Sequence, residues 1–338
     1  MQTLKIGING FGRIGRQAFK ALRLNYPHTV EVVAVNDLFD AAQNANLLQH
    51  DSTYGRFPEQ VRVDEDMIHV GDWSVRNFAY TDPKRIPWAE MGVDVVIEAT
   101  GIFRTGPQAR AHLEAGAKKV IITAPGKEVD RTIVLGVNGQ EYDPQQDHIL
   151  SNASCTTNCL APVAWAVHRA FEIQIGSMCT VHAYTNDQRI LDLPHKDPRR
   201  ARAAGQNIIP TTTGAAKLVG QVIPELEGKI DGYAMRVPVP TVSVVDFTAQ
   251  VAKATDTEAL NQVLHQAAEN ELQGILGYAS EPLVSSDFIM DPHSAIVDPE
   301  FNSVREEHWV KVMAWYDNEW GYSCRVADLV EMVRQKGF

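Results

Sequence analysis

The chain has 338 residues, of which 44% are hydrophobic and 22% are charged, and its formal net charge is −11. This ordinary globular composition argues against disorder, and the negative charge disfavours nonspecific binding to nucleic acid. Because single hydrophobic cores stop growing at roughly 250–300 residues, the length predicts about two domains.

The sequence also lacks the signals of membrane and secreted proteins. No apolar stretch approaches the length of about 20 residues that spans a bilayer. The opening MQTLKIGING does not have the charged-then-apolar layout of a secretion signal, so we expect a cytoplasmic protein. The four cysteines are too few for a disulfide scaffold, and we expect them to be free thiols. We expect neither a membrane nor nucleic acid among the partners.

The first half of the chain alternates short apolar runs with helical patterns. The expected strands are 4–9, 30–37, 93–100, 119–124, 132–137 and 148–151. Four of these runs are nearly continuous in apolar residues, as in parallel strands that helices cover on both faces. Between them, the spacing of apolar residues predicts helices over 13–25 and 106–117. This alternation predicts an α/β domain with a doubly wound sheet of the Rossmann type.

After residue 151 the pattern changes. Residues 242–251 and 309–317 show the partial two-residue alternation of antiparallel strands with one covered face. Helical spacing returns in 256–270 and in 324–335. No repeat or long linker separates the halves, so we expect a tight domain boundary near residue 151. We expect the second half to be an α+β domain with a largely antiparallel sheet.

The first motif is a glycine-rich turn, Gly10-Phe-Gly12-Arg-Ile-Gly15, which follows a predicted strand and opens a predicted helix. In this context the glycines permit a tight turn and a close approach of the backbone to a pyrophosphate, which the helix N-terminus attracts. Asp37 ends the second strand, where a carboxylate can accept hydrogen bonds from an adenosine ribose and would repel a 2′-phosphate. The motif therefore favours NAD. The alternative is a turn and a capping carboxylate with no ligand.

The second motif is SNASCTTNC, with Cys155 at its centre. Small neighbours, Ser154 and Thr156, leave the sulfur open, and a helix start beside it would stabilise a thiolate. Pro162 conflicts with a regular helix, so we expect a bend there or a late start. Cys179 and Cys324 are interpreted as buried small residues.

A nucleophilic thiolate needs a base nearby. His182 is the best candidate among eleven histidines because it ends an apolar run, where a pocket would open. The sequence alone does not show that His182 meets Cys155. These two residues and Cys159 lack a fourth ligand at zinc-type spacing, so we expect no metal site.

The sequence resembles phosphorylating glyceraldehyde-3-phosphate dehydrogenase. The resemblance rests on INGFGRIGR, SNASCTTNC, HAYTNDQ, RRARAAG, TTTGAAK, MRVPVP and WYDNEWGYS. It implies a dinucleotide-binding domain in residues 1–153, completed by a C-terminal helix in 319–338, and a catalytic domain in 154–318. It also implies a homotetramer, in which the loop matching residues 184–205 reaches a neighbouring subunit's cofactor site.

The resemblance implies roles for the matching residues. Cys155 would be the nucleophile and His182 the base. The phosphate of the substrate would bind Thr185 and Arg236, and inorganic phosphate would bind Ser154, Thr213 and Gly214. Arg200 would lie near both anions, and Thr156, which flanks Cys155, is assigned to the substrate site. The residues implied to bind the cofactor are Gly10, Gly12, Arg13, Ile14, Gly15, Asp37, Thr123 and Asn318.

The implied reaction converts D-glyceraldehyde 3-phosphate and inorganic phosphate into 1,3-bisphosphoglycerate, with reduction of NAD⁺. Thiolate attack on an aldehyde gives a thiohemiacetal, which loses hydride as His182 removes a proton. Phosphate then attacks the resulting thioester. Both substrates carry phosphate, which arginines and hydroxyls bind well. The RRARAAG, TTTG and MRVP segments supply such groups. A solvated basic loop is the alternative interpretation for one of the arginines 199, 200 and 202.

Some positions depart from the usual family pattern. Pro198 stands in HKDPRRAR where the family usually has leucine, which puts the shape of the loop carrying Arg200 in question. Thr81 precedes Asp-Pro where many relatives have arginine, which puts one cofactor contact in question. APGK at 124–127 resembles a branch with NADP-using members, whereas Asp37 resembles the NAD-preferring pattern, as does Leu-Pro at 193–194. We expect NAD, with NADP as a secondary cofactor.

Two other functions stay open at this point. Erythrose-4-phosphate dehydrogenase is a sister activity on the same scaffold, and we rank it second because Thr185, Thr213 and Gly214 are intact. A non-catalytic NAD-binding scaffold is the second alternative. The complete set of a nucleophile, a base and two anion sites weighs against it.

Overall fold

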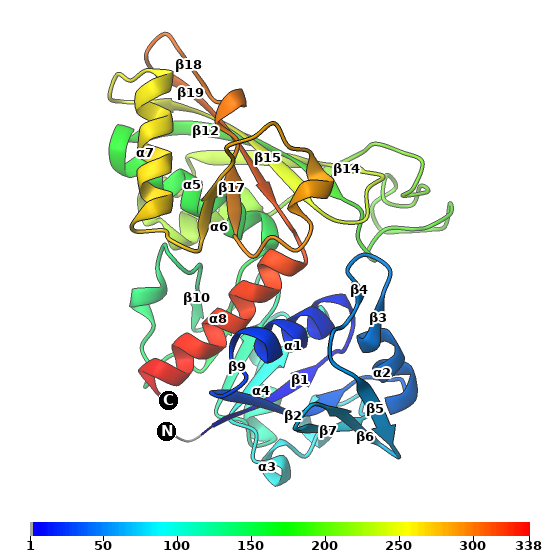
Figure 1. The fold of residues 1–338 in the computed structure, drawn as a ribbon. Coiled ribbons are helices and arrows are strands. Elements are labelled where there is room, and N and C mark those ends of the chain that lie inside the picture. Colours follow the sequence, from blue (N-terminus) through cyan, green and yellow to red (C-terminus); the bar gives the residue numbers. More distant parts are fainter. Residues whose placement is uncertain (1–2) are drawn as a thin grey trace. The chain divides into compact units, whose positions relative to one another are not determined.

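The computed structural model describes residues 3–338, which form two compact units (Figure 1). The first unit comprises the residues up to 133, together with 140–153 and 323–338. The second unit comprises residues 134–139 and 154–322. Each unit has its own sheet and its own core, and each is described separately below.

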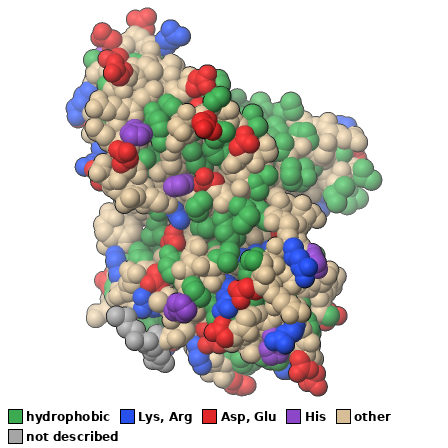
Figure 2. Space-filling view, in the orientation of Figure 1, with side chains coloured by type: hydrophobic (Ala, Val, Ile, Leu, Met, Phe, Trp, Pro, Cys, Tyr) green, Lys and Arg blue, Asp and Glu red, His purple; other side chains and the backbone are tan. Residues whose placement is uncertain are grey.

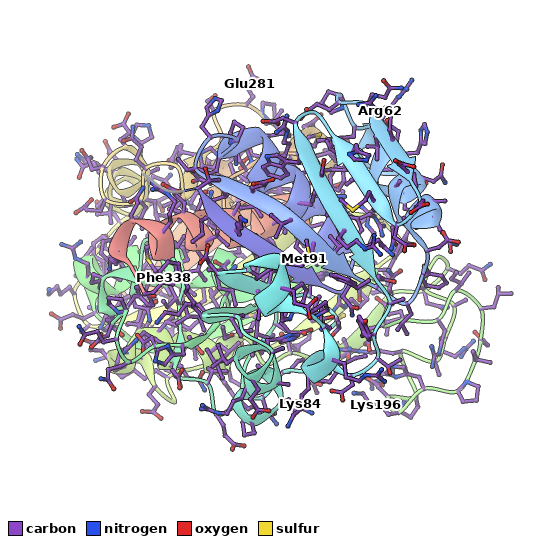
Figure 3. The ribbon with its side chains drawn as sticks, turned by 90° about the horizontal axis from the view of Figure 1, so that it is seen from below. Arg62, Lys84, Met91, Lys196, Glu281 and Phe338 are labelled. Atoms are coloured by element: carbon purple, nitrogen blue, oxygen red, sulfur yellow. The ribbon has the colours of Figure 1, made fainter. Side chains whose placement is uncertain are left out.

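The first unit is built on a nine-stranded sheet with the order β10-β11-β9-β8-β1-β2-β7-β6-β5. Its neighbours pair in parallel from β10 to β7, whereas β5, β6 and β7 pair antiparallel. The strands are β1 (Leu4–Asn9), β2 (Val30–Asn36), β5 (Val61–Asp64), β6 (Met67–Val70), β7 (Trp73–Phe78), β8 (Val95–Glu98), β9 (Lys119–Ile122), β10 (Arg131–Thr132) and β11 (Ile149–Ser151). Arg62, labelled in Figure 3, marks the edge strand β5. A separate hairpin joins β3 (His50–Asp51) and β4 (Gly55–Arg56).

Helices connect the parallel strands of this sheet. They are α1 (Arg13–Asn25), α2 (Ala41–Gln49), α3 (Trp88–Met91) and α4 (Gly106–Glu114), with a 3₁₀ turn η1 (Pro83–Arg85) and a second, η2 (Gly139–Glu141), at the edge of the unit. The buried stripe of α1 includes Ala18, Phe19 and Leu22. Residues 323–338, most of α8 (Trp320–Lys336), also belong here. Hydrogen bonds from Tyr26 to Asp328 and from Thr29 to Glu331 tie this helix to the turn after α1.

The second unit is built on an eight-stranded sheet with the order β13-β14-β12-β15-β19-β17-β16, and β18 pairs with β19. The pairs β12–β14 and β16–β17 are parallel, and the others are antiparallel. The strands are β12 (Ile173–Ala183), β13 (Ile209–Thr212), β14 (Ile230–Val237), β15 (Ser243–Val251), β16 (Leu276–Tyr278), β17 (Ala295–Val297), β18 (Ser303–Arg305) and β19 (Trp309–Tyr316).

Helices cover one face of this second sheet. They are α5 (Cys155–Phe171), α6 (Ala215–Val222) and α7 (Thr257–Glu269), with 3₁₀ turns η3 (Pro224–Leu226), η4 (Ser285–Phe288) and η5 (Pro299–Phe301). Helix α5 packs against β15 and β19. Val245, Phe247 and Ala249 of β15 are buried, while the residues between them are half-buried. This alternation is the pattern of a sheet with one covered face.

The predicted fold class is confirmed: the chain is α/β with a parallel-rich Rossmann sheet and a mostly antiparallel second sheet. The predicted strand at 132–137 is wrong beyond Thr132. The chain turns there instead, because Gly136 has a φ of 84° and the Val134 amide donates to Asn138 Oδ1 at 2.9 Å. The sequence patterns also missed β5, β6, β7, β12 and β14.

The late start expected for the helix around Pro162 is also wrong. Helix α5 begins at Cys155 and continues past Pro162 to Phe171. Ser154 caps it, because its hydroxyl accepts the Thr157 amide at 3.0 Å. This cap fixes the first turn ahead of the proline, whose missing N–H removes one hydrogen bond later in the helix.

Candidate active site

Cys155 is the first residue of α5, one position after the capping serine. Ala153, just before the cap, has a φ of 54°, in the left-handed region that suits small residues. This turn of small residues connects strand β11 to the helix. Cys155 is half-buried, whereas Cys159, one helical turn later, is buried. Cys324 is buried as expected, but the expectation of a buried Cys179 is wrong, because it is half-buried on β12.

Cys155 and His182 meet. The Sγ atom of Cys155 lies 3.5 Å from Nε2 of His182, which is the second-last residue of β12. On the other side of the ring, Nδ1 lies 2.7 Å from the carbonyl oxygen of Ala183. Nε2 accepts the thiol proton in the tautomer whose ring hydrogen is on Nδ1 and is donated to this carbonyl; Arg236 Nη1, 2.6 Å from the same Nδ1, then donates to the Ala183 carbonyl and not to the ring. The geometry is that of a nucleophile beside its general base.

Burial shapes the acid–base behaviour of this pair. It raises the pKa of the Cys155 thiol, while the charge of Arg236 and hydrogen bonds from Thr156 act in the opposite direction. Burial, together with the charges of Arg236 and Arg200, lowers the pKa of His182 to about 3. Burial therefore opposes the stabilisation of a thiolate that we expect from the helix start. The imidazole is unprotonated at neutral pH and available to take the thiol proton as sulfur attacks.

Arg236 is positioned beside this pair by strand pairing. It lies on β14, directly opposite His182 of β12 in the register. Its Nη1 atom donates to the carbonyl of Ala183 at 3.0 Å and lies 2.6 Å from Nδ1 of His182. Its Nε atom is buried and has no hydrogen-bond partner among the described residues. A buried arginine with an open donor is suited to an anion such as phosphate.

Arg200 is held in place by its neighbours in the loop before β13 and in that strand. Its Nε atom donates to Thr211 Oγ1 at 2.9 Å, and Nη2 donates to the Thr212 carbonyl at 3.2 Å. Asp187 forms an ion pair with Nη1. Arg200 lowers the pKa of both His182 and Arg236, so its charge reaches the same site. Asp187 and Thr211 were missed in the sequence, although Asp187 lies in the HAYTNDQ segment.

The starts of two helices lie side by side near Cys155. Gly214 is the residue before α6, and the Thr213 hydroxyl accepts the Ala215 amide at 3.2 Å. The Thr157 hydroxyl lies 2.7 Å from the Ser154 hydroxyl and also reaches the carbonyl of Ala215 at 3.5 Å. Helix N-termini attract anions. The structure thus brings Ser154, Thr213 and Gly214 together, as an anion site requires.

Thr156 is placed differently from the prediction. It is buried, and its hydroxyl bonds the hydroxyl of Tyr316 at 2.9 Å. The Tyr316 hydroxyl also lies 2.8 Å from Thr180 Oγ1, and its ring stands at a centroid distance of 5.9 Å from His182. This placement does not support contact between the Thr156 side chain and a substrate, because the helix turns it toward the core. Tyr316 was missed; its inward position in the alternating β19 was the available signal.

Two more predicted residues have partners in the second unit. The amide of Thr185 donates to Gln188 Oε1 at 3.2 Å, which orders the turn that follows β12. Asn318 is buried, and its Oδ1 accepts the hydroxyl of Ser243 at 2.9 Å. Ser243 in turn accepts the Ala183 amide at 3.0 Å. Asn318 is therefore linked through one serine to the end of β12, next to His182.

In the first unit, the glycine-rich turn has the shape of a ligand cradle. Gly10 has a φ of 90°, and a side chain there would meet the backbone of Thr100. A side chain at Gly15 would meet the carbonyl of Gly10. A side chain at Gly12 would meet no atom within 4 Å, and Gly12 offers no side-chain cap to α1. Contacts within the protein explain the glycines at positions 10 and 15, and the open space at Gly12 would admit the close approach of a phosphate.

The other predicted cofactor residues surround this turn. Asp37 Oδ2 accepts the Phe11 amide at 2.7 Å, and the second carboxylate oxygen, Oδ1, is suited to ribose hydroxyls. Arg13 and Ile14 open α1, and the Arg13 guanidinium is bound by Asp51 at 2.8 Å. Thr123 follows β9 and donates to the carbonyl of Glu98 through its amide and its hydroxyl. These residues fit a dinucleotide along the carboxyl edge of the sheet.

No group of three or more His, Cys, Asp or Glu side chains in residues 3–338 could hold a metal ion. No helix in the described part of the chain combines the length and the apolar composition needed to cross a membrane.

The Rossmann unit and the unit carrying a cysteine–histidine pair define a dinucleotide-dependent oxidoreductase. Residues 4–106 match the family described as glyceraldehyde 3-phosphate dehydrogenase, NAD binding domain, and residues 154–318 match its C-terminal domain. The chain belongs to the glyceraldehyde-3-phosphate dehydrogenase family, and NAD is its cofactor.

Curated relatives cover almost the full chain. Glyceraldehyde-3-phosphate dehydrogenase from Geobacillus stearothermophilus is 55% identical over 99% of both chains. Glyceraldehyde-3-phosphate dehydrogenase 1 from Bacillus subtilis is 54% identical over 99% of both chains, and the enzyme from Mycolicibacterium smegmatis is 52% identical over 98% of both.

Proposed function

We propose that this protein oxidises D-glyceraldehyde 3-phosphate with NAD⁺ and inorganic phosphate, giving 1,3-bisphosphoglycerate. The observation that carries the proposal is the 3.5 Å contact between Cys155 Sγ and His182 Nε2, with Arg236 and Arg200 beside it. The names of the full-length relatives favour this reaction over erythrose 4-phosphate oxidation and over a non-catalytic scaffold.

In the first step, Sγ of Cys155 bonds to the aldehyde carbon while Nε2 of His182 takes the thiol proton. The backbone N–H groups at the start of α5 and the imidazolium stabilise the alkoxide, which is protonated to a thiohemiacetal. His182, neutral again, then removes the hydroxyl proton, so that the carbon can release hydride and become a thioester. Bound NAD⁺ supplies the acceptor for that hydride.

In the second step, inorganic phosphate attacks the thioester and the Cys155 thiolate leaves, giving the acyl phosphate. We assign the phosphate of the aldehyde to Thr185 and Arg236, and inorganic phosphate to Ser154, Thr213 and Gly214. We assign Arg200, which Asp187 and Thr211 hold in place, to a position near both anions. Guanidinium groups and hydroxyls provide the charge-assisted hydrogen bonds that two phosphates require.

We assign the cofactor to the carboxyl edge of the first unit's sheet. The pyrophosphate would approach Gly12 and the first turn of α1, with Gly10, Gly15, Arg13 and Ile14 shaping the turn. Asp37 would bind the adenosine ribose, and Thr123 and Asn318 complete the set. We retain the division into domains 1–153 and 154–318, with helix 319–338 completing the first, as part of this proposal.

The protein is further proposed to be a cytoplasmic homotetramer. The loop between β12 and β13 exposes Ile190 at 89%, Leu191 at 71% and Leu193 at 58%. Figure 2 shows hydrophobic side chains gathered around this loop, and Lys196 in Figure 3 marks it. Exposed apolar side chains in such numbers support a subunit interface. Light scattering coupled to size-exclusion chromatography tests this: a mass of one subunit would contradict it.

Rapid mixing of enzyme, NAD⁺ and aldehyde without phosphate tests the reaction. We expect a burst of NADH equivalent to one turnover per site, and steady turnover only after phosphate is added. Cys155→Ser should abolish the burst, whereas Cys179→Ser, at a half-exposed cysteine on β12, should keep it. Steady turnover without phosphate would point to a hydrolytic enzyme, and faster turnover of erythrose 4-phosphate would favour the sister activity.

A further inference from the structure

The last residues of three adjacent parallel strands are polar and buried. Asn9 ends β1, Asn36 ends β2 and Glu98 ends β8, and Asn9 lies opposite both of the others in the register. Their exposed fractions are 2%, 4% and 1%. The loops that follow β1 and β2 carry residues assigned to the cofactor, and the loop that follows β8 lies against the first of them. Buried polar side chains require hydrogen-bond partners, and these partners indicate the role of the three residues.

The three side chains form one continuous row. Asn9 Nδ2 donates to Glu98 Oε2 at 2.6 Å, and Asn36 Nδ2 donates to Asn9 Oδ1 at 2.8 Å. Asn36 also donates to the Tyr80 carbonyl at 2.9 Å, and its Oδ1 accepts the Tyr80 amide at 2.8 Å. Because each amide has distinct donor and acceptor ends, these contacts fix the orientation of both asparagines.

The other end of the row is fixed by an imidazole. His112 Nε2 lies 2.9 Å from Glu98 Oε2, and Trp88 Nε1 lies 3.0 Å from His112 Nδ1. An indole nitrogen can only donate, so His112 Nδ1 must accept and its hydrogen must be on Nε2, where it is donated to Glu98. Trp88 begins α3, which the label of Met91 locates in Figure 3, and it is buried in an apolar cluster.

Glu98 also binds the loop that follows β8. Its Oε1 atom accepts the Thr100 amide at 2.9 Å and also the Thr100 hydroxyl. That hydroxyl in turn accepts the Ile102 amide at 3.0 Å. The backbone of Thr100 lies against Gly10, so closely that a side chain on Gly10 would come within 2.6 Å of the Thr100 nitrogen. The Glu98 carboxylate thus fixes the Thr100 backbone against which Gly10 of the glycine-rich turn packs.

We propose that Glu98, oriented by Asn9 and His112, is the positioning residue of the NAD groove in the first unit. Trp88, His112, Glu98, Asn9 and Asn36 form what we call the carboxyl-edge network. It holds the Thr100 loop against Gly10, and through Asn36 it holds the strand end that leads to Asp37. The proposal rests on NAD binding in this unit, and it adds five residues that do not touch the cofactor.

A buried polar group at the opposite edge of the same sheet offers a matched comparison. Lys119 is the first residue of β9 and is fully buried. Its Nζ atom donates to the carbonyl of Asp147 at 2.9 Å and to that of Pro144. These hydrogen bonds hold the loop before β11, at the amino edge of the sheet. Lys119→Met therefore removes buried hydrogen bonds of the same unit without touching the carboxyl-edge network.

The test measures NAD affinity and thermal stability in the full-length protein. Glu98→Gln replaces one acceptor oxygen by a donor, which then faces either the Thr100 donors or the Asn9 and His112 donors. We expect both Glu98→Gln and Lys119→Met to lower the melting temperature. Only Glu98→Gln should raise the dissociation constant of NAD, by about tenfold, in calorimetric titration. ADP-ribose, which lacks nicotinamide, should lose the same factor.

Equal dissociation constants for the wild type and Glu98→Gln would overturn the proposal, because the network would then be structural only. Equal losses of affinity in Glu98→Gln and Lys119→Met would overturn it too. If Glu98→Gln does not fold, Trp88→Phe is the alternative variant, because it removes the donor to His112 Nδ1. We expect its dissociation constant for NAD to exceed that of Lys119→Met by about threefold. A wild-type protein that binds neither NAD nor ADP-ribose would instead contradict the cofactor assignment itself.

Discussion

Cys155 and His182 are 27 residues apart in the sequence, on different elements, and their Sγ and Nε2 atoms lie 3.5 Å apart. The helix start of α5 fixes the first residue and the end of β12 fixes the second. The contact joins a thiol whose pKa burial raises to an imidazole whose pKa burial lowers. Each group taken alone resists ionisation, so proton transfer between them is the step on which the chemistry depends.

His182→Asn should lower kcat by about 10²–10⁴-fold, because the variant loses the proton acceptor at Nε2. NAD affinity should stay unchanged, since His182 is not among the residues assigned to the cofactor. His265→Asn is the control, because His265 is on the exposed side of α7. Steady-state kinetics of both variants check this, and a kcat within twofold of the wild type in His182→Asn would exclude the general base.

Substitutions of Arg236 and Arg202 should have different effects on the KM for the aldehyde. Arg236→Leu should raise the KM for glyceraldehyde 3-phosphate by about 10²-fold or more, because a desolvated charge-assisted pair is lost. Arg202→Leu should change it little, because Arg202 is exposed and pairs with Asp192 at 3.0 Å. Glyceraldehyde without phosphate should react equally with the wild type and with Arg202→Leu. Similar KM values for both variants would contradict the assignment of Arg236.

Asp37→Ala should raise the ratio of kcat/KM for NADP to that for NAD by about tenfold or more, since a carboxylate no longer faces the 2′-phosphate. The variant also removes the acceptor of the Phe11 amide, so NAD binding itself should weaken. Asp66→Ala, at an exposed ion pair with Arg76, is the control. An unchanged cofactor ratio would refute the role of Asp37.

Tyr316→Phe should destabilise the protein by about 1–3 kcal/mol, because the hydroxyls of Thr156 and Thr180 lose their shared partner in a buried site. Tyr233→Phe, at an exposed tyrosine on β14, should change stability by less. Urea unfolding gives both values. An equal effect of the two changes would show that the Tyr316 hydroxyl does not anchor the first turn of α5.

Local patterns predicted the elements that are regular along the chain. Helix α1 has the expected bounds 13–25, and α7 differs from its expected range by one residue at each end. The positions of the glycine-rich turn and of Asp37, each directly after a strand, could also be predicted from the local sequence. The strand expected at 132–137 failed because two turn-forming residues, Gly136 and Asn138, outweigh its apolar character.

Non-local pairing decides the rest of the site. Arg236 lies beside His182 only because β14 pairs in parallel with β12 in one register, which neither segment reveals alone. Thr156 was assigned to the substrate because its neighbour is Cys155, but the helix directs its side chain to Tyr316. The burial that raises the pKa of Cys155 comes from packing around the thiol, and only the folded structure shows it.

The rate at which iodoacetamide alkylates Cys155 at neutral pH tests the central claim most directly. We expect the wild type to react faster than His182→Asn, because Nε2 of His182 takes the thiol proton as sulfur attacks. In His182→Asn the reaction should be slower and should require higher pH, since the raised thiol pKa is then unopposed by a base. Equal alkylation rates with the same pH dependence in the wild type and in His182→Asn would contradict the account.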